Sequence, residues 1–135
     1  MSGSRVRDAM VSEPVTLGAE ESAVEAGRRL AQPDVRAVLV CDEGRLVGVV
    51  TRTTLVREVV AAGRDPRTTP LRDLAEPPRF TVEADLPLEE AYGLLEERDL
   101  ERVPVVEDGR LVGVLSRSGV QRRLAEDEPP VDSEL

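Results

Sequence analysis

A five-residue sequence occurs twice in this chain, and its two copies define the register of a longer internal repeat. Arg45–Val49 reads RLVGV and returns unchanged as Arg110–Val114. The same offset, 110 − 45 = 65, aligns residues 6–60 with 71–125 without a gap, and 18 of these 55 positions are identical. A repeat at constant spacing indicates one structural unit used twice. Two units are too few for a solenoid, so we expect a pseudo-symmetric pair with a cleft along its two-fold axis.

The composition is compatible with a small globular core made of aliphatic side chains. Hydrophobic residues make up 40% of the 135 positions, with one Phe, one Tyr and no Trp. All 18 basic residues are arginines, and the chain has no Lys, Ile or Asn. Because the codons for Lys, Ile and Asn are AT-rich, their absence suggests a bacterial source with a GC-rich genome.

The charge distribution argues against nucleic acid and membrane partners. The net charge is −9, and it arises entirely in residues 68–135, which hold 8 Arg and 17 acids, whereas residues 1–67 hold 10 of each. Nucleic acid and anionic lipid both require a basic surface. The start Met1–Ser4 is unlike a signal peptide, and no apolar run is long enough to span a bilayer. With one Cys, no intrachain disulfide can form, so we expect a cytoplasmic protein.

Each repeat predicts the element order β-α-β-β-α, which is an α+β fold. Alternation and turn residues predict strands over 15–17, 35–41 and 45–51 in the first repeat, and over 80–82, 102–107 and 110–116 in the second. Helical spacing and capping residues predict helices over 23–30, 52–62, 88–95 and 117–125, the first of them beginning with a capping box made by Ser22 and Glu25. We therefore place the first repeat at 5–62, a linker at 63–70, the second repeat at 71–125 and an acidic disordered tail at 126–135.

This pattern resembles the CBS domain, named for cystathionine beta-synthase, which occurs in tandem pairs called Bateman modules. The resemblance covers roughly residues 5–125. It is carried by Val6–Met10, by the strand Val103–Val106 and by the two Gly-Arg-Leu-Val-Gly hairpins, each of which runs into a hydroxyl residue at a helix start. In that family the pair usually binds an adenine nucleotide or related adenosyl ligand in its cleft, and it regulates a partner. The resemblance implies the same function here, with AMP, ADP, ATP or S-adenosylmethionine as candidate regulatory ligands and no required cofactor.

The family's ribose and phosphate motif, Gly-x-x-Thr/Ser-x-x-Asp, identifies the candidate site. It reads Gly48-x-x-Thr51-x-x-Thr54 in the first repeat and Gly113-x-x-Ser116-x-x-Gly119 in the second. The Asp that accepts hydrogen bonds from ribose hydroxyls is therefore absent from both copies. Since Thr54 retains a hydroxyl, we favour the first motif. The resemblance implies these ligand-binding positions: Thr16, Val38, Thr51, Arg52, Thr54, Thr81, Val103, Pro104, Ser116 and Arg117.

Each of these positions also has a purely structural interpretation. Thr51 and Ser116 suit helix caps, and Gly48 can serve packing alone. Arg52 and Arg117 can bind phosphate or can pair with surface carboxylates. Sequence alone leaves these alternatives open.

Two function classes remain, because the residues that most catalytic sites need are missing. The chain has no His, no Gly-rich P-loop and no Cys–carboxylate cluster at metal-ligand spacing, so we expect neither an enzyme nor a metal site. The favoured class is a ligand sensor that signals to an unknown protein partner in trans. The alternative is a ligand-free module for dimerisation or protein interaction.

The second helix of each repeat is the expected dimer surface. It carries apolar residues that we expect to be exposed, namely Leu55, Val56, Val59, Val60, Val120 and Leu124. An isologous homodimer would bury them.

Overall fold

The computed structural model describes residues 3–12 and 14–128, and these form two compact units. Of these residues, unit 1 comprises 3–12, 80–107 and 112–128, and unit 2 comprises 14–79 and 108–111. Each unit is therefore assembled from more than one stretch of sequence. Residues that precede the first strand belong to the unit of the second repeat, and residues 70–76 belong to the unit of the first.

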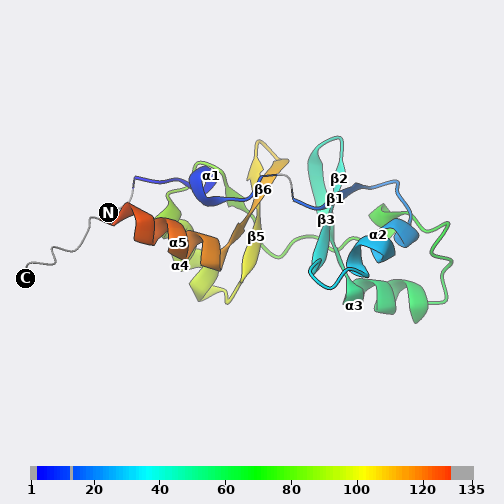
Figure 1. Ribbon diagram of the computed structural model, residues 1–135. Helices are drawn as coiled ribbons and strands as arrows, with labels where there is room; N and C mark the ends of the chain where they lie inside the picture. Colours follow the sequence, from blue (N-terminus) through cyan, green and yellow to red (C-terminus); the bar gives the residue numbers. More distant parts are fainter. Residues whose placement is uncertain (1–2, 13, 129–135) are drawn as a thin grey trace, which may run out of the picture. The chain divides into compact units, whose positions relative to one another are not determined.

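Unit 2 contains the elements of the first repeat in the predicted β-α-β-β-α order (Figure 1). They are β1 (Thr16–Gly18), α2 (Ala23–Leu30), β2 (Ala37–Asp42), β3 (Arg45–Thr51) and α3 (Arg52–Leu55), which continues as a π-helix over Val56–Val60. β1 pairs in parallel with β2, and β2 forms an antiparallel hairpin with β3. Glu43 and Gly44 have φ of 51° and 84° at the hairpin turn, the conformation of a type I′ turn.

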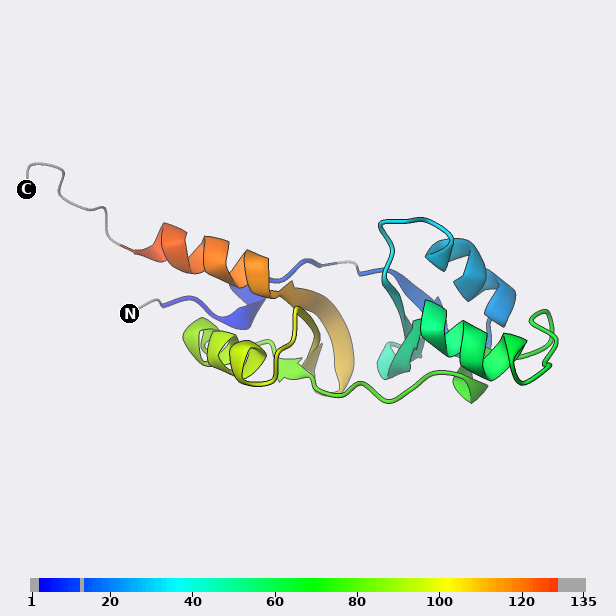
Figure 2. The ribbon, with the colours of Figure 1, turned by 90° about the horizontal axis from the view of Figure 1, so that it is seen from below.

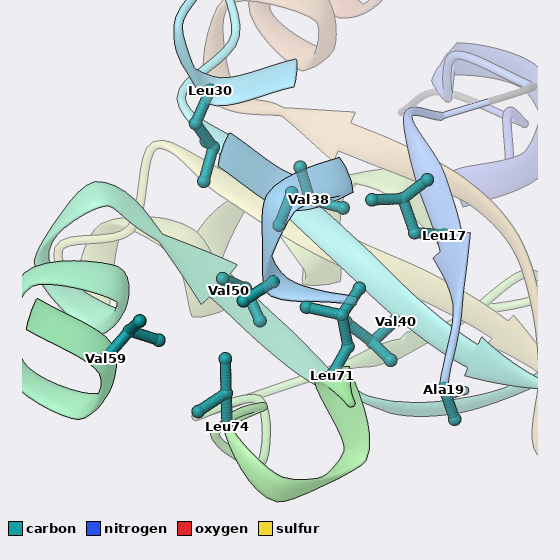
Figure 3. Close-up of a cluster of buried hydrophobic side chains, with 11 residues drawn as sticks. Leu17, Ala19, Leu30, Val38, Val40, Val50, Val59, Leu71 and Leu74 are labelled. Carbon is teal, nitrogen blue, oxygen red and sulfur yellow. The ribbon is translucent and has the colours of Figure 1, made fainter. Parts of the chain in front are cut away.

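The core of unit 2 lies between this sheet and the helices. One face of α2 buries Ala23, Ala26 and Leu30 against Val38, Val40 and Val50 of the sheet. The short 3₁₀-helix η2 (Leu71–Asp73) adds Leu71 and Leu74 to the same cluster, as Figure 3 shows. The segment that follows the first repeat therefore completes the core of that repeat.

Unit 1 contains the second repeat together with the short helix α1 (Val6–Ala9). Its strands β4 (Val82–Glu83), β5 (Arg102–Glu107) and β6 (Arg110–Ser116) lie in the order β4-β5-β6, and β4 is parallel to β5. Helices α4 (Leu88–Glu97) and α5 (Arg117–Asp127) contact each other (Figure 2). The cluster of buried side chains is entirely aliphatic, and Val6 from α1 is fully buried in it.

The fold class predicted from the repeat is confirmed, and three local features differ. Ser22 is the N-cap of α2 but makes no side-chain capping bond, so the Ser22–Glu25 capping box does not form. The second helix of the first repeat changes to π geometry at Val56, which its sequence did not indicate. α5 extends to Asp127, two residues into the segment expected to be a disordered tail. Residues 129–135 of that tail lie outside the described part of the chain.

Candidate functional site

In unit 2, three of the predicted ligand-binding residues lie on neighbouring strands at one level of the sheet. Thr51 at the end of β3 is paired with Ala37, and Thr16 at the start of β1 is paired with Leu39. Val38 lies between these two partners on the central strand β2 and is fully buried. The register therefore brings Thr16, Val38 and Thr51 together at the point where β3 runs into α3. We call this place the first junction.

Thr51 caps α3 through a reciprocal pair of hydrogen bonds with Thr54. The Thr54 amide donates to Thr51 Oγ1 at 3.3 Å, and the Thr51 amide donates to Thr54 Oγ1 at 3.0 Å. The two hydroxyl oxygens are themselves 3.0 Å apart. A threonine thus takes the place of the Glu or Gln that usually closes a capping box.

The burial of Thr54 bears on which of the two hydroxyl groups donates the hydrogen bond between them. Thr54 is only 1% exposed, and within the described residues its hydroxyl contacts only the amide and the hydroxyl of Thr51. Either hydroxyl can be the donor in this contact, and because a buried hydroxyl proton needs an acceptor, we infer that Thr54 donates to Thr51 Oγ1. Thr51 Oγ1 then accepts two hydrogen bonds, and its own proton is left to donate elsewhere. The half-buried Thr51 is therefore suited to bind an acceptor such as a phosphate oxygen, and Thr54 acts by positioning it.

The second junction, where β6 runs into α5 in unit 1, has a simpler arrangement. Ser116 Oγ accepts from the Gly119 amide at 3.0 Å and lies 3.4 Å from Ser118 Oγ. A Cβ added at Gly119 would lie 2.9 Å from Ser116 Oγ and 3.6 Å from the Ala9 carbonyl oxygen. Because the nearest of these atoms belongs to a rotatable hydroxyl, a small side chain can be accommodated at position 119.

The two motif arginines hold backbone carbonyls of the loops between helix and strand. Arg52 Nη2 donates to the carbonyls of Gln32 and Val35, both at 2.9 Å. Arg117 does the same in unit 1, where Nη2 donates to Leu95 at 3.1 Å and to Leu100 at 2.9 Å. The carbonyl acceptors of Arg52 belong to neither alternative considered from sequence, phosphate or surface carboxylate, whereas Arg117 also meets the second alternative. Arg117 has two longer carboxylate contacts as well, with Asp99 at 3.6 Å and Glu101 at 3.4 Å.

The two motif glycines make room for another stretch of backbone. A Cβ on Gly48 would lie 2.5 Å from the Glu76 carbonyl oxygen, and a Cβ on Gly113 would lie 2.8 Å from that of Val11. Next to each glycine, Val49 exchanges two hydrogen bonds with Glu76, and Val114 exchanges two with Val11. Glycine is required at both positions for this close approach. The signal in the sequence is the repeated Arg-Asp pair at 7–8 and 72–73, which marks the two docking segments.

The remaining predicted residues lie in unit 1 at positions equivalent to those of the first junction. Val103 is buried on β5, and Pro104 follows it and is half-buried. Thr81 immediately precedes β4, whose first residue Val82 pairs with Val105. Thr81 and Pro104 are therefore neighbours by register, as Thr16 and Leu39 are in unit 2.

The apolar positions of the second helices are only partly available as a surface. Val59 is 5% exposed and Val120 is fully buried, so both belong to their own cores and the expectation that they are exposed is wrong. Val56 and Val60 are 59% and 73% exposed. They lie four residues apart on α3 and its π-helical continuation, and so form the exposed apolar pair of that helix.

The described residues contain neither a metal-binding cluster nor a membrane-spanning helix. No group of three or more Cys, Asp or Glu side chains within 3–12 and 14–128 is arranged to hold a metal ion. Over the same residues, no helix combines the length and apolar character needed to cross a bilayer.

Comparison with known proteins identifies the family. The model of the CBS domain matches residues 6–61 and again residues 71–126. Hypoxic response protein 1 of Mycobacterium tuberculosis is 32% identical over 121 residues, which cover 89% of this chain and 85% of the relative.

Solved structures agree with this match. The crystal structure of Hypoxic Response Protein I with two coordinated zinc ions has a TM-score of 0.75 and 30% identity, covering 89% of this chain and 98% of that one. The crystal structure of CBSX2 in complex with AMP has a TM-score of 0.71 and 29% identity, covering 92% and 98%. This chain is a member of the CBS-domain family and carries two CBS domains in tandem.

Proposed function

We propose that this protein is a regulatory sensor that binds an adenosine-containing nucleotide at the first junction and signals to a protein partner in trans. The observation that carries the proposal is the convergence of Thr16, Val38 and Thr51 at one level of the sheet. The inferred direction of the Thr54–Thr51 hydrogen bond, which leaves the Thr51 proton to donate, supports it. Membership of the CBS family and the AMP complex of CBSX2 support the same ligand class.

In such a complex the Thr51 hydroxyl would donate a hydrogen bond to a phosphate oxygen, because phosphate oxygens accept hydrogen bonds and the Thr51 proton has no other acceptor among the described residues in this arrangement. The backbone of β2 around Val38 would face the adenine edge, and Thr16 would border the ligand. Arg52 would hold the Gln32–Val35 loop, which leads into β2, and so would act through position rather than through charge. Thr54 would keep the Thr51 hydroxyl oriented.

The absence of the ribose carboxylate sets an upper limit on the expected affinity. Thr54 is buried and bonded to Thr51, and Gly119 has no side chain, so neither replaces a carboxylate acceptor. Losing a hydrogen bond to a charged group costs about 1.5–3 kcal/mol, or roughly ten- to a hundredfold in affinity. We therefore expect binding in the micromolar range or weaker, with phosphate contacts contributing more than sugar contacts.

The proposed role is regulatory and not catalytic. CBS domains are in general regulatory modules. We propose that this chain has no catalytic activity, requires no cofactor and acts in the cytoplasm.

The alternative function, a ligand-free interaction module, rests on a different observation. Val56 and Val60 place two large apolar side chains in solvent on one helix. In this account the module forms a homodimer through the second helices, and the missing carboxylates reflect a site that no longer binds nucleotide. Sedimentation of the wild type and of a Val56→Ser/Val60→Ser variant tests it, because an interface through this helix predicts that only the wild type is dimeric at micromolar concentration.

Calorimetric titration with AMP, ADP, ATP and S-adenosylmethionine tests the sensor proposal. Thr51→Ala should weaken binding of the preferred ligand about tenfold, which corresponds to about 1.4 kcal/mol. Thr53→Ala is the matched control, because Thr53 lies exposed on the same turn of α3 and should leave the affinity unchanged. Ser116→Ala should also have little effect if the first junction is the binding site. Equal weakening by Thr51→Ala and Thr53→Ala, or binding of none of the four ligands, would refute the proposal.

A further inference from the structure

The residues that precede the first strand are docked on unit 1 by a continuous set of backbone hydrogen bonds. The Val6 amide donates to Leu86 at 2.9 Å and the Arg7 amide to Ala84 at 3.0 Å. At the other end of the segment, Val11 and Val114 exchange two hydrogen bonds of 2.8 and 3.0 Å. We call residues 4–11 the leading segment.

Residues 69–76 are the counterpart of the leading segment in unit 2, displaced by the repeat offset of 65. The Leu71 amide donates to Glu21 at 2.8 Å, the Arg72 amide to Ala19 at 2.9 Å, and Glu76 exchanges two bonds with Val49. The backbone docking is thus the same in both units. Any difference in how firmly the two segments are held must come from their side chains.

The apolar anchors of the two segments differ substantially. The counterpart buries Leu71 and Leu74 at 0% and 3% exposure. At the equivalent positions the leading segment has Val6, which is fully buried, and Ala9, which is only half-buried. Leu71 and Leu74 together have four more side-chain carbons than Val6 and Ala9. The half-buried Met10, which packs on the unit 1 core where the counterpart has Ala75, offsets part of this difference. At a factor of about four per buried methylene, what remains amounts to roughly one order of magnitude in the equilibrium for detachment.

Polar contacts hold the leading segment at the unit 1 surface. Arg7 Nη2 contacts Asp85 Oδ1 at 2.6 Å and Glu107 Oε2 at 2.5 Å, and these hydrogen bonds, first that of Asp85, raise the pKa of Arg7 above its ordinary value. All three side chains are at least 40% exposed. Ser4 Oγ donates to Asp127 at 2.6 Å and accepts from Arg123 at 3.1 Å. Exposed ion pairs of this kind contribute little and are screened by salt.

The leading segment also lies against the second junction. Met10 Sδ and the Val11 carbonyl oxygen occupy the space that a side chain on Gly113 would need. The Ala9 carbonyl oxygen lies 3.6 Å from the Cβ position of Gly119, at the start of α5. Movement of this segment would therefore uncover both glycines of the second motif.

We propose that the leading segment is a releasable strap over the second junction, which detaches in a local equilibrium while the cores of both units remain folded. Its detachment would open the Ser116–Gly119 turn and free the backbone groups of Val114. The counterpart in unit 2, with its two buried leucines, is a permanent part of the core. The two equivalent docking sites would thus differ in function. The segment of unit 2 stays bound, whereas the leading segment of unit 1 detaches and binds again.

Native-state hydrogen exchange of the full chain, with no ligand added, tests this proposal. The amides of Val6, Arg7 and Val11 should exchange about tenfold faster than those of Leu71, Arg72 and Glu76, because regions open locally according to their own stability. Low concentrations of denaturant should leave exchange of the leading segment unchanged, since a local opening exposes little surface. Exchange at rates equal to those of core amides such as Val105, with the same denaturant dependence, would overturn the proposal.

A pair of matched variants separates release of the strap from general destabilisation. Arg7→Gln should raise exchange of the Val6 and Val11 amides a few-fold and leave that of Val105 unchanged. Arg72→Gln removes the equivalent arginine in unit 2, which pairs with Glu20 and Asp42, and should leave the leading segment unaffected. Equal acceleration of the leading segment by both variants would contradict a strap that is held locally.

Discussion

Replacement of Gly48 by alanine is the most decisive test of how the docked segments are held. The added Cβ would lie 2.5 Å from the Glu76 carbonyl oxygen and 2.9 Å from the Ala75 Cβ. The first of these neighbours is backbone, so the docked segment must move as a whole. Gly93→Ala is the matched control, because Gly93 lies exposed in α4 with nothing within 4 Å of its Cβ position.

The expected cost follows from the contacts that this movement breaks. Val49 and Glu76 lose two backbone hydrogen bonds, each worth about 0.5–1.5 kcal/mol. Overpacking typically adds about 1–3 kcal/mol. Gly48→Ala should therefore destabilise the protein by about 2–6 kcal/mol. Gly93→Ala should instead stabilise it by about 0.5–1 kcal/mol, because alanine is the better residue inside a helix.

Thermal and urea denaturation followed by circular dichroism at 222 nm provides the assay. For a chain of this size, 2–6 kcal/mol corresponds to a fall in Tm of roughly 10–20 °C. Opposite signs for the two glycine-to-alanine changes are the specific result expected. A Gly48→Ala variant within about 0.5 kcal/mol of the wild type would show that the close approach of Glu76 is not a constraint on the fold.

Three further predictions follow from the site and its surroundings. Arg117→Ala should cost about 1.5–3 kcal/mol in urea denaturation, because the Leu95 and Leu100 carbonyls lose a charged donor that is 21% exposed, and Arg117→Lys should recover only part of this. Gly119→Asp restores the carboxylate at the second junction only, so calorimetry should show a second AMP site while the Kd of the first junction stays unchanged, and a stoichiometry that remains at one would contradict that reasoning. Burial raises the pKa of the Cys41 thiol, so its stabilising contribution is present below pH 9 and is lost as pH rises through the folded-state pKa. A Cys41→Ala variant should accordingly lose less stability than the wild type between pH 8 and 10.

The repeat allowed most of the fold to be predicted, because hairpins and capped helices are specified by local sequence. The strands Arg45–Thr51, Arg102–Glu107 and Arg110–Ser116 have the predicted bounds, since turn residues define both ends of each hairpin. The docking of residues 4–11 and 69–76 was not predicted. Nothing in a short segment of sequence specifies which core it joins, and that choice depends on contacts far along the chain.

The candidate site shows the same division between local and distant interactions. The capping role of Thr51 could be anticipated, because a hydroxyl at a strand-to-helix transition has a local partner three residues later. The role of Arg52 could not, because its acceptors are carbonyls about twenty residues away and backbone acceptors leave no trace in side-chain sequence. Burial of Val59 and Val120 was likewise missed, since helical spacing alone does not say which apolar face meets the sheet.

A two-dimensional ¹H–¹⁵N NMR titration of the wild-type protein with AMP tests the central claim most directly, because it reports both whether the ligand binds and where. We expect the largest shift changes at the amides of Thr16, Val38 and Thr51, with smaller changes at the equivalent positions of the second repeat. No shift changes up to millimolar AMP, or changes confined to residues far from the first junction, would contradict a nucleotide sensor built on Thr51.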